Sequence, residues 1–111
     1  MVVNNPFTYE KFLWIFEHDN LFDIDETEFY FDDDPDKIEH MIGCLRKYDN
    51  PYWVGECDIP NGCEYRTASE LLEAKIFNRR SMKDRWENIA FYSIGGISVE
   101  EWIDMYHDKF F

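Results

Sequence analysis

The segment from Trp53 to Arg66, WVGECDIPNGCEYR, limits the possible folds of this chain more than any other. Pro60-Asn61-Gly62 is typical of a loop between two antiparallel strands, because Pro suits the second position of a type I turn and Gly suits the left-handed residue that follows. In the register that places Ile59 opposite Cys63, apolar residues share one face and charged residues share the other. The apolar face then holds Trp53, Cys57, Ile59, Cys63 and Tyr65. The sequence therefore predicts a β-hairpin with one buried face.

Apolar periodicity and capping patterns predict the elements around this hairpin. The predicted helices cover about 7–18, 35–48, a segment after the N-cap Thr67, a short segment with Met82 and Trp86, and a segment after the N-cap Ser98. Alternation of buried and exposed positions predicts two further strands, over 28–32 and 89–94.

This order of elements mixes helices and strands, and a length of 111 residues fits one domain. Apolar residues make up 45% of the chain and aromatic residues 19%, which is enough to form a core and too much for a disordered acidic chain. We therefore expect a single α+β domain over residues 1–111. Its sheet should be small and mostly antiparallel, with about four strands, and packed with helices.

The net charge is −13, from 24 acidic and 11 basic residues. The charge is uneven, because residues 1–66 carry 16 acids and 5 bases whereas residues 67–111 carry 8 and 6. Such a chain repels DNA, RNA and anionic membranes, so we expect neither direct nucleic-acid binding nor a membrane partner. A basic protein is the expected partner. Five bases form a basic cluster that is expected to balance nearby acids on an exposed turn: Lys75, Arg79, Arg80, Lys83 and Arg85. The alternative is that this cluster contacts a phosphate or an acidic patch of a partner.

The sequence also bears on the location of the protein. Three cysteines, an odd number, do not suit the disulfide framework of a secreted domain. The N-terminus lacks the charged and apolar regions of a signal peptide, and no apolar run reaches the ~20 residues of a membrane span. We expect a soluble, cytoplasmic protein.

The acidic residues are densest in DIDETEFYFDDDPD, residues 23–36, which holds eight carboxylates and no basic residue. Asp34 and Asp36 have a local use, because anions are favourable at the start of a helix. Phe29 and Phe31 are expected to anchor the strand in the core. The remaining charges, with Tyr30 as an aromatic anchor, are the predicted partner-binding surface, at a charge density comparable to that of DNA. This surface comprises Asp23, Asp25, Glu26, Glu28, Tyr30, Asp32 and Asp33. The alternative is a solvated loop and strand edge that resists pairing with other chains.

A zinc-stabilised structural module is a second possibility. His40 and Cys44 share a face of the predicted helix, and Cys57 and Cys63 share a face of the predicted hairpin. The alternative is that these thiols are buried and pack as small apolar side chains. On that interpretation the protein needs no cofactor.

No catalytic pattern stands out. Pro35-Asp36 with Glu73-Ala74-Lys75 matches a metal-nuclease pattern only superficially, because both pieces lie on predicted helices and the chain repels nucleic acid. The acidic stretch lacks the central glycine of a calcium-binding EF-hand loop. The serines and histidines match no nucleophile motif. We therefore expect a binding protein and not an enzyme.

The segment EAKIFNRRSMKDRWENIAFYSIGGISVEEW, residues 73–102, resembles small accessory proteins of phages and mobile elements in low-GC Gram-positive bacteria. Compact acidic proteins in that setting act as counter-defence factors, and anti-CRISPR proteins occupy the basic groove of a CRISPR effector. The resemblance implies an inhibitor of a nuclease or CRISPR effector, acting in the host-cell cytoplasm, and assigns no role to any residue. An immunity protein that neutralises a nuclease toxin remains the alternative built on the same electrostatics.

Overall fold

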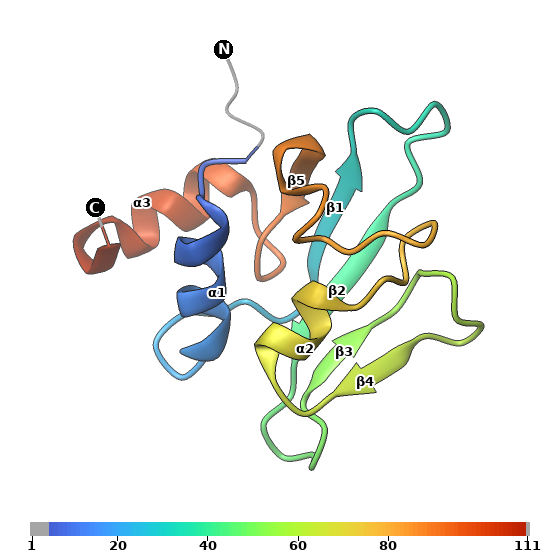
Figure 1. Ribbon diagram of the computed structural model, residues 1–111. Helices are drawn as coiled ribbons and strands as arrows, with labels where there is room; N and C mark the ends of the chain where they lie inside the picture. The colour runs from blue at the N-terminus through green and yellow to red at the C-terminus, as the bar shows by residue number, and fades with distance from the viewer. Residues whose placement is uncertain (1–4, 111) are drawn as a thin grey trace.

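A computed structural model describes residues 5–110, with side chains up to Lys109, and contains three α-helices and a five-stranded sheet (Figure 1). The helices are α1 (Tyr9–Glu17), α2 (Ala68–Glu73) and α3 (Val99–Phe110). The strands are β1 (Thr27–Phe31), β2 (His40–Cys44), β3 (Tyr52–Val54), β4 (Cys63–Tyr65) and β5 (Ile89–Ser93), and a 3₁₀ turn, η1 (Trp86–Asn88), precedes β5. The predicted single α+β domain is confirmed, with one more strand than expected.

The strand order is β4-β3-β2-β1-β5, and every neighbouring pair is antiparallel. β1 to β4 form a meander, and β5 pairs with the free side of β1 after α2 and a long connection. The predicted hairpin is β3–β4, but its register is wrong, because Val54 pairs with Cys63 and Tyr52 pairs with Tyr65. Trp53 therefore lies opposite Glu64 and away from the face of Cys63.

The loop of this hairpin explains the error in register. The backbone N–H of Asp58 donates to Ile76 O at 2.7 Å, which ties the chain to the segment after α2 instead of to β4. The expected turn at residues 59–62 is still present. The Gly62 N–H donates to Ile59 O at 3.0 Å, and Asn61 and Gly62 both have positive φ. Contacts distant in sequence therefore lengthen the loop to residues 55–62.

The predicted helix over 35–48 is wrong, because this segment contains a turn and strand β2. Asp34 does accept the backbone N–H groups of Asp36 and Ile38, as a helix cap would. The chain then turns away at Lys37, whose φ is +50°. Ile42 is fully buried between β1 and β3. The pairing of β2 with β1 and β3 thus outweighs the helical periodicity of residues 35–48.

Three of the other predicted helices are confirmed, as α1, α2 and α3. Thr8, Thr67 and Ser98 accept backbone N–H groups three residues ahead, at 3.1, 3.1 and 3.2 Å. They begin α1, α2 and α3, as side-chain acceptors at N-caps do. The short helix predicted around Met82 and Trp86 is instead a series of turns that ends in η1.

The core lies between the sheet and helices α1 and α2, while α3 lies beside β5 (Figure 1). Thr27, Phe29 and Phe31 of β1 point into this core and are buried, whereas Glu28 and Tyr30 alternate to the outer face. Aromatic rings dominate the core: Phe7, Phe12, Phe16, Phe22, Phe29, Phe31, Phe77, Phe91 and Trp102 are all buried. Within residues 5–110, no helix has the length and apolar character that crossing a bilayer requires.

Candidate functional site

Strand β1 divides the acidic stretch between the two ends of the sheet. Residues 23–26 lead into β1 and residues 32–36 follow it, so about 17 Å of extended chain separates the two groups. The residues predicted to bind a partner are therefore spread over three places. Asp23, Asp25 and Glu26 lie at one end, Glu28 and Tyr30 on the outer face, and Asp32 and Asp33 at the other end.

Asp25 is a structural residue at the first end. Its Oδ1 accepts the backbone N–H of Cys44 at 3.1 Å and the indole N–H of Trp53 at 2.8 Å. A Cβ atom at Gly43 would lie 2.1 Å from this oxygen, so the missing side chain of Gly43 makes room for it. Asp25 thus joins the loop before β1 to β2 and β3. Its neighbour Glu26 is exposed, with a φ of +59°.

Asp23 contributes to the fold through its backbone. Its N–H donates to the hydroxyl of Tyr106 at 2.9 Å, and its carbonyl accepts the indole N–H of Trp102 at 2.7 Å. The Asp23 side chain is left exposed. This end of the acidic stretch therefore fastens α3 to the sheet.

Asp32 and Asp33 have intramolecular partners at the other end of β1. Asp32 donates its backbone N–H to Asn88 O at 2.8 Å and accepts the side-chain amide of Asn88 at 3.2 Å. Asp33 forms an ion pair with Arg85. The guanidinium carbon of Arg85 lies 3.9 Å from the ring centroid of Phe31, so the charge pair rests on the edge of the core.

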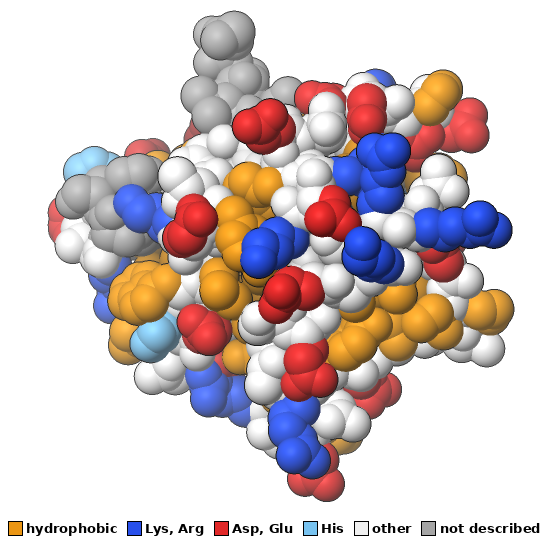
Figure 2. Space-filling model, in the orientation of Figure 1, with side chains coloured by type: hydrophobic (Ala, Val, Ile, Leu, Met, Phe, Trp, Pro, Cys, Tyr) orange, Lys and Arg blue, Asp and Glu red, His pale blue; other side chains and the backbone are white. Residues whose placement is uncertain are grey.

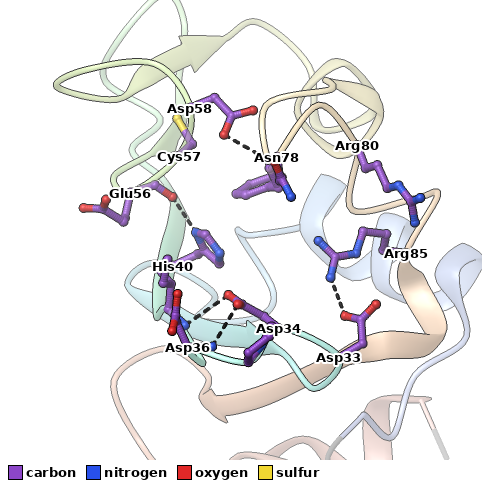
Figure 3. A pocket seen from close by; sticks show the side chains of 13 residues that line it. Asp33, Asp34, Asp36, His40, Glu56, Cys57, Asp58, Asn78, Arg80 and Arg85 are labelled. Atoms are coloured by element: carbon purple, nitrogen blue, oxygen red, sulfur yellow. Dashed lines mark hydrogen bonds and ion pairs between the residues drawn. The ribbon is translucent and has the colours of Figure 1, made fainter.

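An open groove of about 610 Å³ lies at this second end of the sheet, and we call it the acidic groove. Its walls are the β1–β2 loop, the β3–β4 loop and the turn Phe77–Arg80, which lie together on the right in Figure 1. Five carboxylates and two arginines line it: Asp33, Asp34, Asp36, Glu56, Asp58, Arg80 and Arg85 (Figure 3). The β1–β2 loop and the β3–β4 loop, about 20 residues apart in the chain, thus both contribute acidic side chains to the acidic groove.

His40 lies at the bottom of the acidic groove, at the start of β2. Only 8% of the residue is exposed, and its ring packs against Phe29, Phe31 and Phe77 with centroid separations of 5.3, 5.5 and 4.9 Å. Its Nδ1 lies 2.7 Å from the carbonyl oxygen of Glu56. This hydrogen bond links β2 to the β3–β4 loop and fixes the orientation of the ring.

The carboxylates of the groove fall into two groups. Asp34 accepts backbone N–H groups of its own loop, and Asp58 accepts those of Asn78 and Arg79, both at 2.9 Å. Asn78 and Arg79 have positive φ, so Asp58 holds an unusual turn in place. The side chains of Asp36 and Glu56, by contrast, form no hydrogen bond or ion pair with any described residue.

The four proposed zinc ligands do not converge. His40 and Cys57 line the groove, Cys63 donates to the hydroxyl of Tyr65 at 3.6 Å, and Cys44 is buried beside Asp25. Burial, with a contribution from Asp19, raises the pKa of the Cys44 thiol to about 12. In the part of the chain that the structure describes, no three His, Cys, Asp or Glu side chains are grouped so as to hold a metal ion.

The basic cluster mixes with acids on the face that carries α1 and α2, where Figure 2 shows both signs side by side. Lys83 lies 3.6 Å from Glu73, and Lys75 lies 3.8 Å from Asp84. Arg85 pairs with Asp33, as described above. Three of the five bases therefore form ion pairs with acids, which fits the expected balancing of local charge.

Comparisons with known proteins found no matching family model, and no match among curated proteins or solved structures.

Sequence reasoning missed His40, Asp36 and Glu56 as members of one site. The helix predicted over 35–48 hid their relation, since a helix there does not pair with β3 and so does not bring Asp36 beside Glu56. One feature of the sequence does favour a strand over a helix at residues 40–44. Gly43 in HMIGC is unfavourable in the middle of a helix, and Ile42 favours a strand.

Proposed function

We propose that this protein is an acidic inhibitor that binds a basic nucleic-acid-binding enzyme and blocks its nucleic-acid site. The observation that supports this most is the gathering of five carboxylates from two separate loops around one open groove. Two arginines line the same groove, so its lining residues carry more negative than positive charge. A basic surface that normally binds phosphates is complementary to such a groove.

The unpaired state of Asp36 and Glu56 favours binding over a purely structural role. Neither exposed carboxylate forms a hydrogen bond or an ion pair with a described residue, and both line the same groove as Asp34 and Asp58. Both are therefore available to lysines or arginines of a partner. The field of the whole chain, at −13, would also accelerate the encounter.

The predicted partner-binding residues belong to this interface to different degrees. Asp33 lines the groove, Asp32 precedes it in the chain, and Tyr30 and Glu28 extend the surface along the outer face of β1. Asp23, Asp25 and Glu26 lie at the opposite end of β1. A partner centred on the groove meets the first group, and only a large partner reaches the second.

The partner class follows from the resemblance of residues 73–102 to phage accessory proteins. A CRISPR effector or another defence nuclease offers the required basic channel, and inhibition would take place in the cytoplasm of the host cell. No membrane is involved in this proposal, and no chemical step is performed by the inhibitor.

A nuclease inhibition assay tests the proposal. Wild-type protein should reduce DNA binding and cleavage by a candidate CRISPR effector, and excess DNA should relieve the inhibition. The double variant Asp36→Lys/Glu56→Lys should inhibit far less. The control Asp49→Lys/Asp104→Lys makes the same change in net charge at exposed positions away from the groove. Equal loss of inhibition in both variants would assign the effect to net charge and remove the groove as the binding site.

A further inference from the structure

A second hollow, of about 390 Å³, lies where the β2–β3 loop meets strands β3 and β4. We call it the aromatic hollow, and the β2–β3 loop beside it is at the bottom of Figure 1. Six residues line it: Leu45, Tyr48, Asn50, Pro51, Trp53 and Glu64. None of these six lines the acidic groove, which lies at the opposite end of β2 and β3. The two hollows are therefore separate surfaces.

Trp53 is an aromatic residue of this hollow whose position is fixed. Tyr52 and Val54 are buried in the core, so Trp53 between them points to the outer face of the sheet. Its indole N–H donates to Asp25 Oδ1 at 2.8 Å. Its ring lies so close to Gly43 that a Cβ atom there would be 2.6 Å from two ring carbons. The ring is therefore held against the sheet, and a ligand that stacks on it does not have to order it first.

Glu64 supplies the charge of the aromatic hollow. It lies directly opposite Trp53 in the β3–β4 pairing, so the two side chains are neighbours on the outer face. Glu64 is exposed and forms no hydrogen bond or ion pair with any residue that the structure describes. Of the six lining residues it is the one that carries a charge. A carboxylate beside an aromatic ring is complementary to a cation.

The wall of the aromatic hollow is apolar and accessible. Leu45 is 39% exposed and Tyr48 is 54% exposed, although both are large hydrophobic residues. Long basic side chains place their methylene groups on such surfaces while the charged end contacts polar partners. The chain already contains a contact of this kind, because the ammonium group of Lys47 lies 5.2 Å from the centroid of the Tyr48 ring. The lining therefore suits a chain of methylenes that ends in a cation.

We infer that the aromatic hollow binds an arginine side chain of a basic partner protein, which stacks on Trp53 and pairs with Glu64. A planar guanidinium group stacks on aromatic rings and can form two parallel hydrogen bonds with one carboxylate. The ammonium group of lysine is a compact, strongly hydrated point charge and is less suited to both contacts at once. This inference goes beyond the proposed function, because it names a second contact surface away from the acidic groove.

Peptide titration followed by NMR tests the inference on the intact protein. The probe is acetyl-Gly-Arg-Gly-amide, and the matched control is the same peptide with citrulline, which keeps the shape and removes the charge. The arginine peptide should shift the indole N–H signal of Trp53 and the amide signals of residues 45–53 and 63–65. Its methylene protons should show contacts with the ring protons of Trp53. The lysine peptide should bind several-fold more weakly, and the citrulline peptide should cause no shift.

Variants locate the site. Glu64→Gln is an exposed change that should leave the fold intact and weaken arginine-peptide binding about tenfold, or about 1.4 kcal/mol. Glu87→Gln, an exposed change just before β5 at the opposite edge of the sheet, should have no effect. Asp36→Asn in the acidic groove should also leave the affinity unchanged. Unchanged affinity in Glu64→Gln, equal binding of the citrulline peptide, or shifts confined to residues 34–38 and 56–58 would overturn the inference.

The inference and the proposed function can fail separately. If the protein inhibits its enzyme but the arginine peptide does not bind at the aromatic hollow, the inference fails and the proposed function stands. If the peptide binds there but no nuclease or CRISPR effector is inhibited, the hollow recognises arginine in another setting and the proposed function fails.

Discussion

Asp25 shows that a carboxylate in an acidic stretch can be part of the fold. Replacing it with Ala leaves two donors, the Cys44 N–H and the Trp53 indole, without their acceptor. Asp25→Ala should therefore lower the free energy of unfolding by about 1–3 kcal/mol. Urea denaturation measures this loss, and Glu26→Ala, an exposed neighbour, should change it far less. Equal effects of the two substitutions would contradict the structural role of Asp25.

Gly43, on β2, leaves the space that the Asp25 carboxylate occupies. A Cβ atom there would approach Asp25 Oδ1 at 2.1 Å and the Trp53 ring at 2.6 Å. Gly43→Ala should cost about 1–3 kcal/mol and alter the fluorescence of Trp53. Gly55→Ala is the matched control, because a Cβ atom at Gly55 meets nothing closer than 3.7 Å. A stable Gly43→Ala protein with unchanged fluorescence would show that this contact is absent.

Cys44 gives a prediction about pH. Burial raises the pKa of its thiol to about 12, and burial likewise raises the pKa of Tyr52 to about 12. The folded state therefore keeps these protons at a pH where the unfolded chain has lost them, so the free energy of unfolding should fall as pH rises from about 9 towards 12. Urea titrations across this range measure the slope, and Cys44→Ala should reduce it. A slope that Cys44→Ala leaves unchanged would remove Cys44 as a cause.

At the scale of elements, the sequence predicts helix starts well, because each cap contacts a group close to it in the chain. Thr8, Thr67 and Ser98 mark helix starts because the cap and the group it binds lie three residues apart. Strand β2 depends instead on β1 and β3, whose pairing no periodicity in 35–48 reveals. The β3–β4 register likewise depends on the contact of Asp58 with Ile76.

The nature of β2 can be tested directly. Thr27 lies opposite Ile42, and Ile42 lies opposite Val54. NMR spectra should show cross-strand contacts between the protons of these pairs, together with slow amide exchange in β2. Strong sequential amide–amide contacts through residues 38–45 would instead indicate the helix that the periodicity suggests.

The acidic groove could not be predicted from the sequence, because it too depends on the pairing of strands. Asp36 and Glu56 belong to loops that meet only because β2 and β3 are neighbours in the sheet. The sequence did predict an acidic surface that includes Asp32 and Asp33, and Asp33 lines the groove. It could not predict that Asp25, Asp32 and Asp33 have intramolecular partners.

At the scale of the whole molecule, a charge of −13 adds self-repulsion to the folded state. Some acids are offset by partners within the chain, as in the ion pairs of Glu73 with Lys83 and of Asp33 with Arg85. Others, including Asp36 and Glu56, form no hydrogen bond or ion pair through their side chains with any residue that the structure describes. We propose that these acids displace nucleic acid from a basic enzyme.

The most direct test is a competition experiment with a candidate CRISPR effector and labelled DNA, at low and high salt. The protein should displace the DNA, its affinity should fall as salt increases, and Asp36→Lys/Glu56→Lys should displace DNA poorly. Simultaneous binding of protein and DNA, or an affinity that salt does not change, would contradict inhibition by an acidic surface.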